Sequence, residues 1–249
     1  FKYLMKKILP LLIAFISFGL FAQTTSPISS SGIKTADEYF NSGLLKQKLK
    51  DYDGAIADFS KAISLNPNDK EAYYNRGNSK LDLENYYEAI ADYTKAIELN
   101  PDYTKAYYNR GVSKQKLKDY YGATADYSKA IELNRNDTES YYNRGLAKNY
   151  LEDYFGAISD YTRTIELNPN KINAYFNRGI SKMKLKDHSG AITDYTKAIE
   201  LNSKYTNAYY NRGISKKSAE DIDGACMDWR NALRLGNKKA SKLISDLCN

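Results

Sequence analysis

The sequence predicts an all-α protein assembled from six copies of a two-helix unit, and three regularities support this fold class. The tripeptide Asn-Arg-Gly recurs with a constant step, at 75–77, 109–111, 143–145, 177–179 and 211–213. In every copy an alanine follows the glycine at a fixed spacing, as Ala89 follows Gly77, and an aspartate comes soon after it, as at Asp92. The residues between them repeat at helical spacing. So regular a step indicates an array of small units, not one irregular core.

The in-phase residues form rows that run along the array. Asn41-Ser42-Gly43 places one more copy before the first complete tripeptide. The alanine row consists of Ala55, Ala89, Ala123, Ala157, Ala191 and Ala225. The aspartate row consists of Asp58, Asp92, Asp126, Asp160, Asp194 and Asp228. Because each row has one member per copy, we interpret both rows as structural.

Residues 1–22 are typical of an export signal. Two adjacent lysines precede an apolar stretch at residues 8–21, which is short for a membrane span. We expect cleavage after Ala22, with Met5 a candidate for the true start, and an uncleaved anchor is the alternative. Residues 23–35, rich in Ser and Thr, are expected to form a flexible tether. The pattern predicts an exported bacterial-type protein, periplasmic or secreted.

The copy at residues 70–103 shows why each unit is expected to contain two helices. Pro101 lacks an amide donor and disfavours helix at the residue before it, so a helix ends there. Two stretches before it carry residues at helical spacing, namely Tyr73, Gly77 and Lys80, then Ala89, Tyr93, Ala96, Ile97 and Asn100. Asn85 lies between the stretches, and aspartate takes its place in the other copies as Asp51, Asp119, Asp153, Asp187 and Asp221. Such residues favour turns and helix starts, so we expect a helix hairpin.

The glycine of each first helix predicts a close contact. Glycine inside a helix costs about 1 kcal/mol relative to alanine. Its presence in all six copies therefore indicates that a side chain there would obstruct packing. We expect its partner to be the alanine that follows at the fixed spacing, as Ala89 follows Gly77, so that the two helices approach closely.

The repeated unit resembles the tetratricopeptide repeat family. The resemblance rests on the 34-residue step and on Tyr73, Gly77, Ala89, Tyr93, Ala96 and Pro101. It implies a right-handed superhelical solenoid of helix-turn-helix repeats, whose first helices line a concave groove that commonly receives peptides. The six repeats would be residues 36–69, 70–103, 104–137, 138–171, 172–205 and 206–239.

Some positions depart from the family pattern. Arg135, Ser203 and Asn237 stand where other copies have proline, and Thr164 replaces an alanine in the fourth copy. We expect these changes to soften particular turns without altering the architecture.

Residues 240–249 are predicted to form a capping helix. Its apolar face would consist of Ala240, Leu243, Ile244 and Leu247. The last repeat of an array exposes an apolar side, which an amphipathic helix can cover.

Two rows are expected to line the groove, as the resemblance implies. The aromatic members are Tyr74, Tyr108, Tyr142, Phe176 and Tyr210, and the amide members are Asn75, Asn109, Asn143, Asn177 and Asn211. An amide offers a donor and an acceptor to the backbone of an extended peptide. Aromatic side chains add apolar contact at low entropy cost. The alternative is that the amides tie adjacent repeats together.

The arginines of the tripeptide are expected to pair with the aspartate row. The first copy keeps Asp58 but has Ser42 in place of arginine, which makes sense if each aspartate serves the arginine of the following copy. We therefore predict the inter-repeat ion pairs Asp58–Arg76, Asp92–Arg110, Asp126–Arg144, Asp160–Arg178 and Asp194–Arg212. The lysines four residues after each arginine either share these carboxylates or attract an acidic ligand.

The two cysteines, Cys226 and Cys248, lie at ends of neighbouring helices that antiparallel packing would bring together. An exported protein meets oxidising conditions, so we predict a disulfide that holds the capping helix. Two separate buried thiols are the alternative.

Little in the sequence indicates catalysis. His188 is the single histidine and takes a place that tyrosine holds in other copies, so no histidine cluster for a metal exists. A set of nucleophile, base and orienting residue is absent as well. We expect neither an enzyme nor a metal or cofactor.

Charge and architecture together favour a binding function. Three of the +7 charges lie in residues 1–22, and the remaining +4 is a weak field that does not favour nucleic acid. We predict a protein–protein interaction scaffold that binds a peptide or protein segment in the groove. A structural assembly or self-association module of a cell-envelope complex is the alternative, and polyanion binding is the third choice. Membrane contact is expected only through an uncleaved signal segment.

Overall fold

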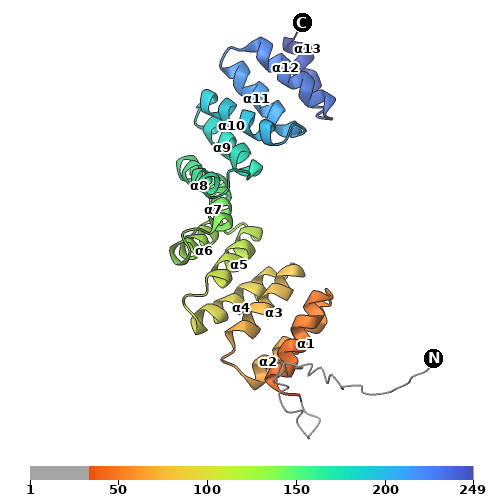
Figure 1. Ribbon diagram of the computed structural model, residues 1–249, viewed down its shortest axis with the longest axis vertical. Helices are drawn as coiled ribbons and strands as arrows, with labels where there is room; N and C mark the ends of the chain where they lie inside the picture. The colour runs from red at the N-terminus through yellow and green to blue at the C-terminus, as the bar shows by residue number, and fades with distance from the viewer. Residues whose placement is uncertain (1–33, 249) are drawn as a thin grey trace, which may run out of the picture. The chain divides into compact units, whose positions relative to one another are not determined.

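Figure 1 shows the chain as a computed structural model, which describes residues 34–248. The chain divides into two units, Phe1–Lys34 and Thr35–Asn249. The predicted export signal at residues 1–22 and the tether up to residue 33 lie outside the described residues. Thr35, expected as the end of the tether, instead caps the first helix, because its side chain and that of Glu38 each accept a hydrogen bond from the other's backbone amide.

Six helix pairs and a closing helix fill the described part of the chain. The first helices of the pairs are α1 (Ala36–Lys48), α3 (Lys70–Asp82), α5 (Thr104–Lys116), α7 (Thr138–Tyr150), α9 (Ile172–Lys184) and α11 (Thr206–Ser218). The second helices are α2 (Tyr52–Leu65), α4 (Tyr86–Leu99), α6 (Tyr120–Leu133), α8 (Tyr154–Leu167), α10 (His188–Leu201) and α12 (Ile222–Arg234). The closing helix is α13 (Ala240–Leu247). The helices at residues 34–248 are all too short or too polar to cross a membrane.

The helices pack in chain order, as the colour sequence of Figure 1 shows. Each first helix packs against the second helix of its own repeat, and that second helix packs against the next first helix. Successive first helices also touch one another, whereas successive second helices make no comparable contact. The first helices therefore form the concave side. The predicted all-α superhelical solenoid of helix pairs is confirmed.

In five of the six repeats the turn between the two helices is closed by an aspartate that caps the second helix. Asp153 Oδ1 accepts a hydrogen bond of 2.9 Å from the amide of Gly156, and the other aspartates at this position cap in the same way. Asn85 makes no such bond. The residue before each cap adopts a left-handed backbone, with φ of 60° to 66°, although none is glycine. The sequence offers no sign of this conformation, because Lys and Glu disfavour it.

The second helices of the first five repeats end at an asparagine whether or not a proline follows, whereas α12 ends at Arg234 with Leu235 as its cap residue. α6 ends at Leu133 and α10 at Leu201, the same place as in the copies that have proline. The Oδ1 atoms of Asn134 and Asn202 accept from the amide two residues later at 3.1 and 3.0 Å, which closes a tight turn. The proline replacements at Arg135 and Ser203 therefore leave the helix ends unchanged.

Each first-helix glycine faces an aromatic ring of the second helix. A Cβ atom on Gly145 would lie 2.8 Å from Cε1 of Tyr161, whose side chain is fully buried. The equivalent rings are Phe59, Tyr93, Tyr127, Tyr195 and Trp229. The alanine row is fully buried too, but the expectation that alanine is the glycine's partner was wrong. Glycine is needed because the ring of the second helix occupies the space that a side chain at this position would fill.

The closing helix covers the end of the last repeat as the sequence indicates. Leu243, Ile244 and Leu247 pack against a buried cluster that includes Trp229 and Ala240. Cys226 of α12 and Cys248 are joined by a disulfide with an S–S distance of 2.03 Å. The closing helix is therefore held by both apolar packing and a covalent bond.

Candidate functional site

The two predicted groove rows lie on the first helices, on the concave side of the solenoid. The aromatic row consists of Phe40, Tyr74, Tyr108, Tyr142, Phe176 and Tyr210, and all six are partly exposed. The asparagine row consists of Asn75, Asn109, Asn143, Asn177 and Asn211, and all five are partly exposed as well. Both rows are thus within reach of a ligand.

Hydrogen bonds join the two rows across repeat boundaries. Asn143 Nδ2 donates to the hydroxyl of Tyr108, in the preceding repeat, at 2.9 Å. The equivalent bonds run from Asn109 to Tyr74 at 3.2 Å and from Asn177 to Tyr142 at 3.0 Å. At these three junctions the amides tie adjacent repeats together, which is one of the two roles that the sequence left open.

Two members of the asparagine row lack this partner because phenylalanine precedes them in the aromatic row. Asn75 follows Phe40, and its Nδ2 donates to the Glu71 carbonyl of its own helix at 2.8 Å. Asn211 follows Phe176, whose ring has no hydroxyl to accept a hydrogen bond. The row is therefore not uniform, although the asparagine itself never changes.

The bonded pairs still offer polar groups to a ligand. A tyrosine hydroxyl that accepts from asparagine keeps its own hydrogen, and the amide keeps its carbonyl oxygen as an acceptor. Burial, with a smaller contribution from Glu139, raises the pKa of Tyr108 and Tyr142 above the ordinary tyrosine value. Both hydroxyls therefore stay protonated donors at neutral pH.

A third row of partly exposed side chains makes much of the same surface apolar. It consists of Val112, Leu146, Ile180 and Ile214, with Asn78 at the corresponding place in the second repeat. At this position the concave side is thus polar on α3 and apolar from α5 to α11. We call Val112, Leu146, Ile180 and Ile214 the apolar row.

Two pockets lie along these first helices. The pocket near α5, of about 490 Å³, is lined by Tyr74, Thr104, Lys105, Tyr108, Asn109, Asn134, Asp137 and Glu139. The pocket between α7 and α9, of about 470 Å³, is lined by Leu146, Asn149, Tyr150, Glu152, Tyr154, Asn177, Ile180 and Lys184. Both combine ring or aliphatic surface with a member of the asparagine row.

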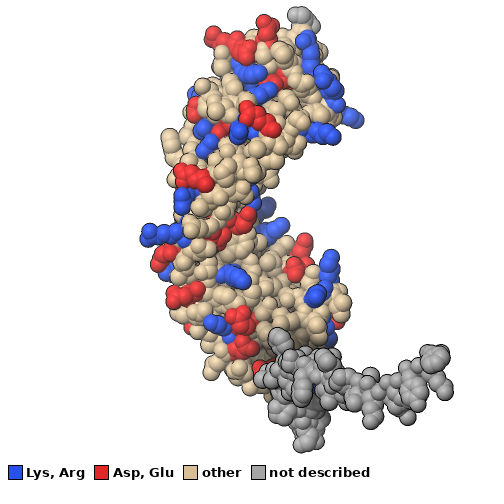
Figure 2. Space-filling model, viewed as in Figure 1, with Lys and Arg blue, Asp and Glu red and all other residues tan. Residues whose placement is uncertain are grey.

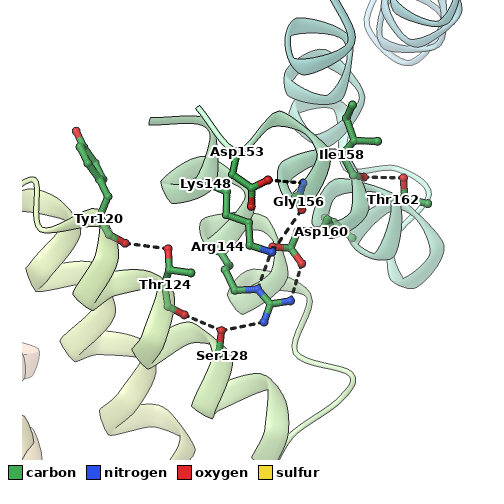
Figure 3. A network of polar contacts seen from close by, with 11 residues as sticks. Tyr120, Thr124, Ser128, Arg144, Lys148, Asp153, Gly156, Ile158, Asp160 and Thr162 are labelled. Atoms are coloured by element: carbon green, nitrogen blue, oxygen red, sulfur yellow. Dashed lines mark hydrogen bonds and ion pairs between the residues drawn. The ribbon is translucent and has the colours of Figure 1, made fainter. Parts of the chain in front are cut away.

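Each arginine of the tripeptide binds the aspartate of its own repeat, as Figure 3 shows for Arg144 and Asp160. Arg144 Nε and Nη2 donate to the carboxylate at 2.9 and 2.6 Å. The equivalent pairs are Arg76–Asp92, Arg110–Asp126, Arg178–Asp194 and Arg212–Asp228. The predicted inter-repeat ion pairs Asp58–Arg76, Asp92–Arg110, Asp126–Arg144, Asp160–Arg178 and Asp194–Arg212 are therefore wrong.

The arginine nevertheless links two repeats, through a hydroxyl instead of a carboxylate. Arg144 Nη1 donates to Ser128 Oγ of the preceding second helix at 3.0 Å (Figure 3). The same bond joins Arg76 to Ser60, Arg110 to Thr94, Arg178 to Thr162 and Arg212 to Thr196. Sequence reasoning missed this hydroxyl row, although its constant step was visible.

In the first copy Ser42 takes the place of the tripeptide arginine. Ser42 donates to Asp58 at 2.6 Å, so a short hydroxyl replaces the arginine where no earlier second helix offers a partner among the described residues. Lys46 lies 2.7 Å from the same carboxylate. The partner that the first copy lacks in the described part of the chain is thus a hydroxyl of an earlier second helix, not the aspartate that the predicted ion pairs required.

The lysine row shares the buried carboxylates. Lys148 Nζ lies 2.8 Å from Asp160 Oδ2, and its side chain is mostly buried. Lys80, Lys114, Lys182 and Lys216 contact their own aspartates at 2.7 to 3.0 Å. Of the two alternatives for this row, the structure shows carboxylate sharing.

The outer surface carries mixed charge and a few exposed rings. Acidic and basic side chains are interspersed over most of the face seen in Figure 2, and basic ones gather near the C-terminal end. Tyr87, Tyr121 and Phe155 recur one repeat apart at the start of second helices and are 77%, 77% and 76% exposed. The single histidine, His188, begins α10 and has a buried Nδ1 without a hydrogen-bond partner among the described residues.

Comparison with known proteins identifies the repeat. Models of the tetratricopeptide repeat match residues 36–69, 71–103, 104–137, 138–171 and 172–205. These matches end at residue 205, before the sixth helix pair, α11 and α12. No curated protein sequence matches the chain.

Several solved structures share the fold. YrrB, described as a TPR protein with an unusual peptide-binding site, is 25% identical, with a TM-score of 0.69 over 76% of this chain and 98% of its own. MamA is 27% identical, with a TM-score of 0.65 over 69% of this chain and 94% of its own. MamA from Desulfovibrio magneticus is 24% identical, with a TM-score of 0.65 over 68% and 96%.

Proposed function

The chain belongs to the tetratricopeptide repeat family, and from this premise we propose that it is a non-catalytic scaffold that binds a peptide or protein segment along its concave side. The repeats and the similar solenoids support a protein–protein interaction scaffold. Beyond this, we propose that the ligand is a peptide, that the groove binds it and that the protein is exported.

The observation that carries the proposal is the apolar row beside two polar rows on one surface. Val112, Leu146, Ile180 and Ile214 are all partly exposed. Exposed apolar side chains next to hydrogen-bonding groups are typical of interaction surfaces. An extended peptide would place alternate side chains on the apolar row and its backbone on the polar rows.

The peptide-binding site ascribed to YrrB adds support, because that protein shares the solenoid at 25% identity. For this chain the ligand chemistry follows from its own residues. The lysine row is bound to the aspartate row, so no observation favours polyanion binding. The ligand that fits is apolar and peptide-like.

We place this scaffold outside the cytoplasm. The charged and apolar pattern of residues 1–22 supports export. A disulfide between the chain's two cysteines is compatible with an oxidising compartment. A component of the bacterial cell envelope is then the partner to seek.

The alternative function, self-association or structural assembly, is favoured by one feature. Tyr87, Tyr121 and Phe155 project from the second helices with three quarters of their surface exposed. Aromatic side chains are enriched at protein interfaces. This outer aromatic row offers a contact surface separate from the concave side.

A paired set of variants separates the two functions. The groove variant replaces Leu146 and Ile180 by lysine, since neither makes an inter-repeat hydrogen bond. The outer variant replaces Tyr121 and Phe155 by serine. Each is immobilised beside the wild type, and proteins captured from a cell-envelope extract are compared.

We expect the groove variant to lose the wild-type partner and the outer variant to keep it. Circular dichroism checks that both retain the helix content of the wild type. A folded groove variant that captures the same partner would refute the proposal. Loss only in the outer variant would support assembly through the outer aromatic row.

A further inference from the structure

The first helix of the array carries two leucines on the side that, in the later repeats, packs against a preceding repeat. Leu45 of α1 is 65% exposed, and Leu49, directly after the helix, is 80% exposed. The residues that stand in the place of Leu45 in the later repeats are all small and fully buried, namely Ser79, Ser113, Ala147, Ser181 and Ser215. Because α1 is the first helix of the described residues, the two leucines lie at the N-terminal end of the array.

Hydrogen bonds show what the equivalent side of the later first helices contacts. Gln47 Nε2 of the first repeat donates to Ser79 Oγ of the second at 3.2 Å, and Ser181 Oγ donates to Asn149 Oδ1 of the preceding repeat at 2.7 Å. A small residue at this position lets the preceding first helix come close enough for such bonds. A leucine there would overpack the same contact. The end of the array at Leu45 is therefore shaped for a partner other than one more repeat of the same kind.

The opposite end of the array is closed. α13 covers the last repeat through apolar packing around Trp229, and the disulfide between Cys226 and Cys248 holds it there. The end repeats of such arrays need a cover of this kind to stay soluble. Leu45 and Leu49 have no comparable cover among the described residues, and apolar side chains exposed together indicate an interaction surface.

The exposed face of α1 carries opposite charges at its two ends. Asp37 lies in the first turn and Lys48 in the last, and both are exposed, as are Asn41, Leu45 and Leu49. Spacings of three and four residues place this set on one face of the helix. An antiparallel copy of the same helix would bring its Lys48 opposite Asp37 and its Asp37 opposite Lys48, whereas a parallel copy would bring like charges together. The face is therefore complementary to itself in the antiparallel orientation.

We propose that this face of α1 is a homodimer interface, in which Leu45 and Leu49 pack against α1 of a second copy across a two-fold axis. In a two-fold contact the same patch of each copy meets the other, so the leucines exclude water between the helices while Asp37 and Lys48 pair at both edges. Because α13 closes the other end, the association stops at two copies. The dimer does not depend on the proposed function. If that function holds, the dimer joins two concave sides in one particle, which would bind a partner with two suitable segments more tightly.

Sedimentation equilibrium of the full chain over a range of concentrations tests the dimer. We expect the wild type to pass from monomer to dimer as the concentration rises and to form no larger species. The combined substitutions Leu45→Ser and Leu49→Ser should raise the dissociation constant about tenfold or more, because they remove the apolar centre of the contact. Leu65→Ser changes an exposed leucine at the end of α2 and is the matched control, which should leave the dissociation constant within about twofold.

Charge reversal tests the antiparallel orientation and the identity of the partner. Asp37→Lys alone and Lys48→Asp alone each place like charges opposite one another at both edges of the dimer, so each should weaken it. Mixing the two variants in equal amounts restores opposite charges at both edges, and the mixed dimer should form with an affinity within about threefold of the wild type. Such a recovery requires two copies of this chain. Circular dichroism checks that each variant stays folded.

A wild type that stays monomeric at every concentration would overturn the inference. If Leu45→Ser then lowered the stability of that monomer, another segment of the same chain would be the occupant of this face. Species larger than a dimer, or mixed variants that do not recover, would overturn the inference as well. The groove variant of Leu146 and Ile180 tests the proposed function separately, and its outcome leaves the dimer unaffected.

Discussion

The guanidinium of Arg144 donates two hydrogen bonds, of 2.9 and 2.6 Å, to the carboxylate of Asp160 and so joins the two helices of one repeat. The aspartate side chain is 3% exposed and also binds Lys148. A third donor of the same arginine, Nη1, donates to Ser128 in the preceding repeat. The Arg144 side chain thus holds the two helices of its own repeat together and joins this repeat to the preceding one.

Removing this carboxylate should destabilise the array severely. Asp160→Ala leaves Arg144 and Lys148 partly buried without their counter-charge, so the free energy of unfolding should fall by about 3–5 kcal/mol. Urea denaturation followed by circular dichroism measures the change. Glu166→Ala, which breaks the exposed pair with Arg163, serves as the control and should cost less than about 1 kcal/mol. Equal effects of the two substitutions would contradict the structure.

Replacing the first-helix glycine should destabilise the protein although alanine is the better helix former. In Gly145→Ala the new Cβ would meet the Tyr161 ring at 2.8 Å. Such overpacking costs about 1–3 kcal/mol, which outweighs or cancels the gain of about 1 kcal/mol in helix propensity. The same substitution in a Tyr161→Leu background should cost less, because the ring is gone. If Gly145→Ala stabilised the wild-type protein, the close packing of Gly145 against Tyr161 would be contradicted.

Opening the disulfide should loosen the C-terminal end of the solenoid. Cys226 and Cys248 are 22 residues apart, and a cross-link over a loop of this size contributes about 2–4 kcal/mol. Denaturation of the wild type with and without a reductant should therefore give different midpoints. The double serine variant should be insensitive to the reductant. Two titratable thiols in the unreduced, denatured protein would show that the bond does not form.

Alkaline pH should destabilise the solenoid. Burial raises the pKa of Tyr205 to about 12 in the folded protein, whereas an unfolded chain has a tyrosine pKa near 10. Below pH 10 both states are protonated and the stability is fully present. Between pH 10 and about pH 12 only the unfolded state loses its proton, so the stability falls as the pH rises.

The measurement is the urea midpoint across this alkaline range, compared between the wild type and Tyr205→Phe. The variant should lose less stability per pH unit, since one of the shifted groups is gone. Burial raises the pKa of Tyr74, Tyr108 and Tyr142 too, so part of the decline should persist. A midpoint that stays constant or rises with pH would contradict these shifts.

Much of the candidate site could be located from the sequence, but the sequence did not show which hydrogen bonds its residues make. The asparagine and aromatic rows are visible as residues in phase, and both lie on the concave side as expected. Whether an amide bonds to the neighbouring repeat depends on the hydroxyl beside it, as the contrast between Asn177, which bonds to Tyr142, and Asn211, which follows Phe176, shows.

The sequence alone determined the repeat, its two helices, the capped end and the buried small residues, because each follows from spacing along a helix. It did not determine the partners of Arg144. Asp160 follows this arginine and Asp126 precedes it at nearly the same separation, and both belong to one row with a constant step, so periodicity cannot distinguish them. Only the tertiary structure decides, because the packing of α7 against α6 and α8 places Asp160 and Ser128 within reach and leaves Asp126 to Arg110.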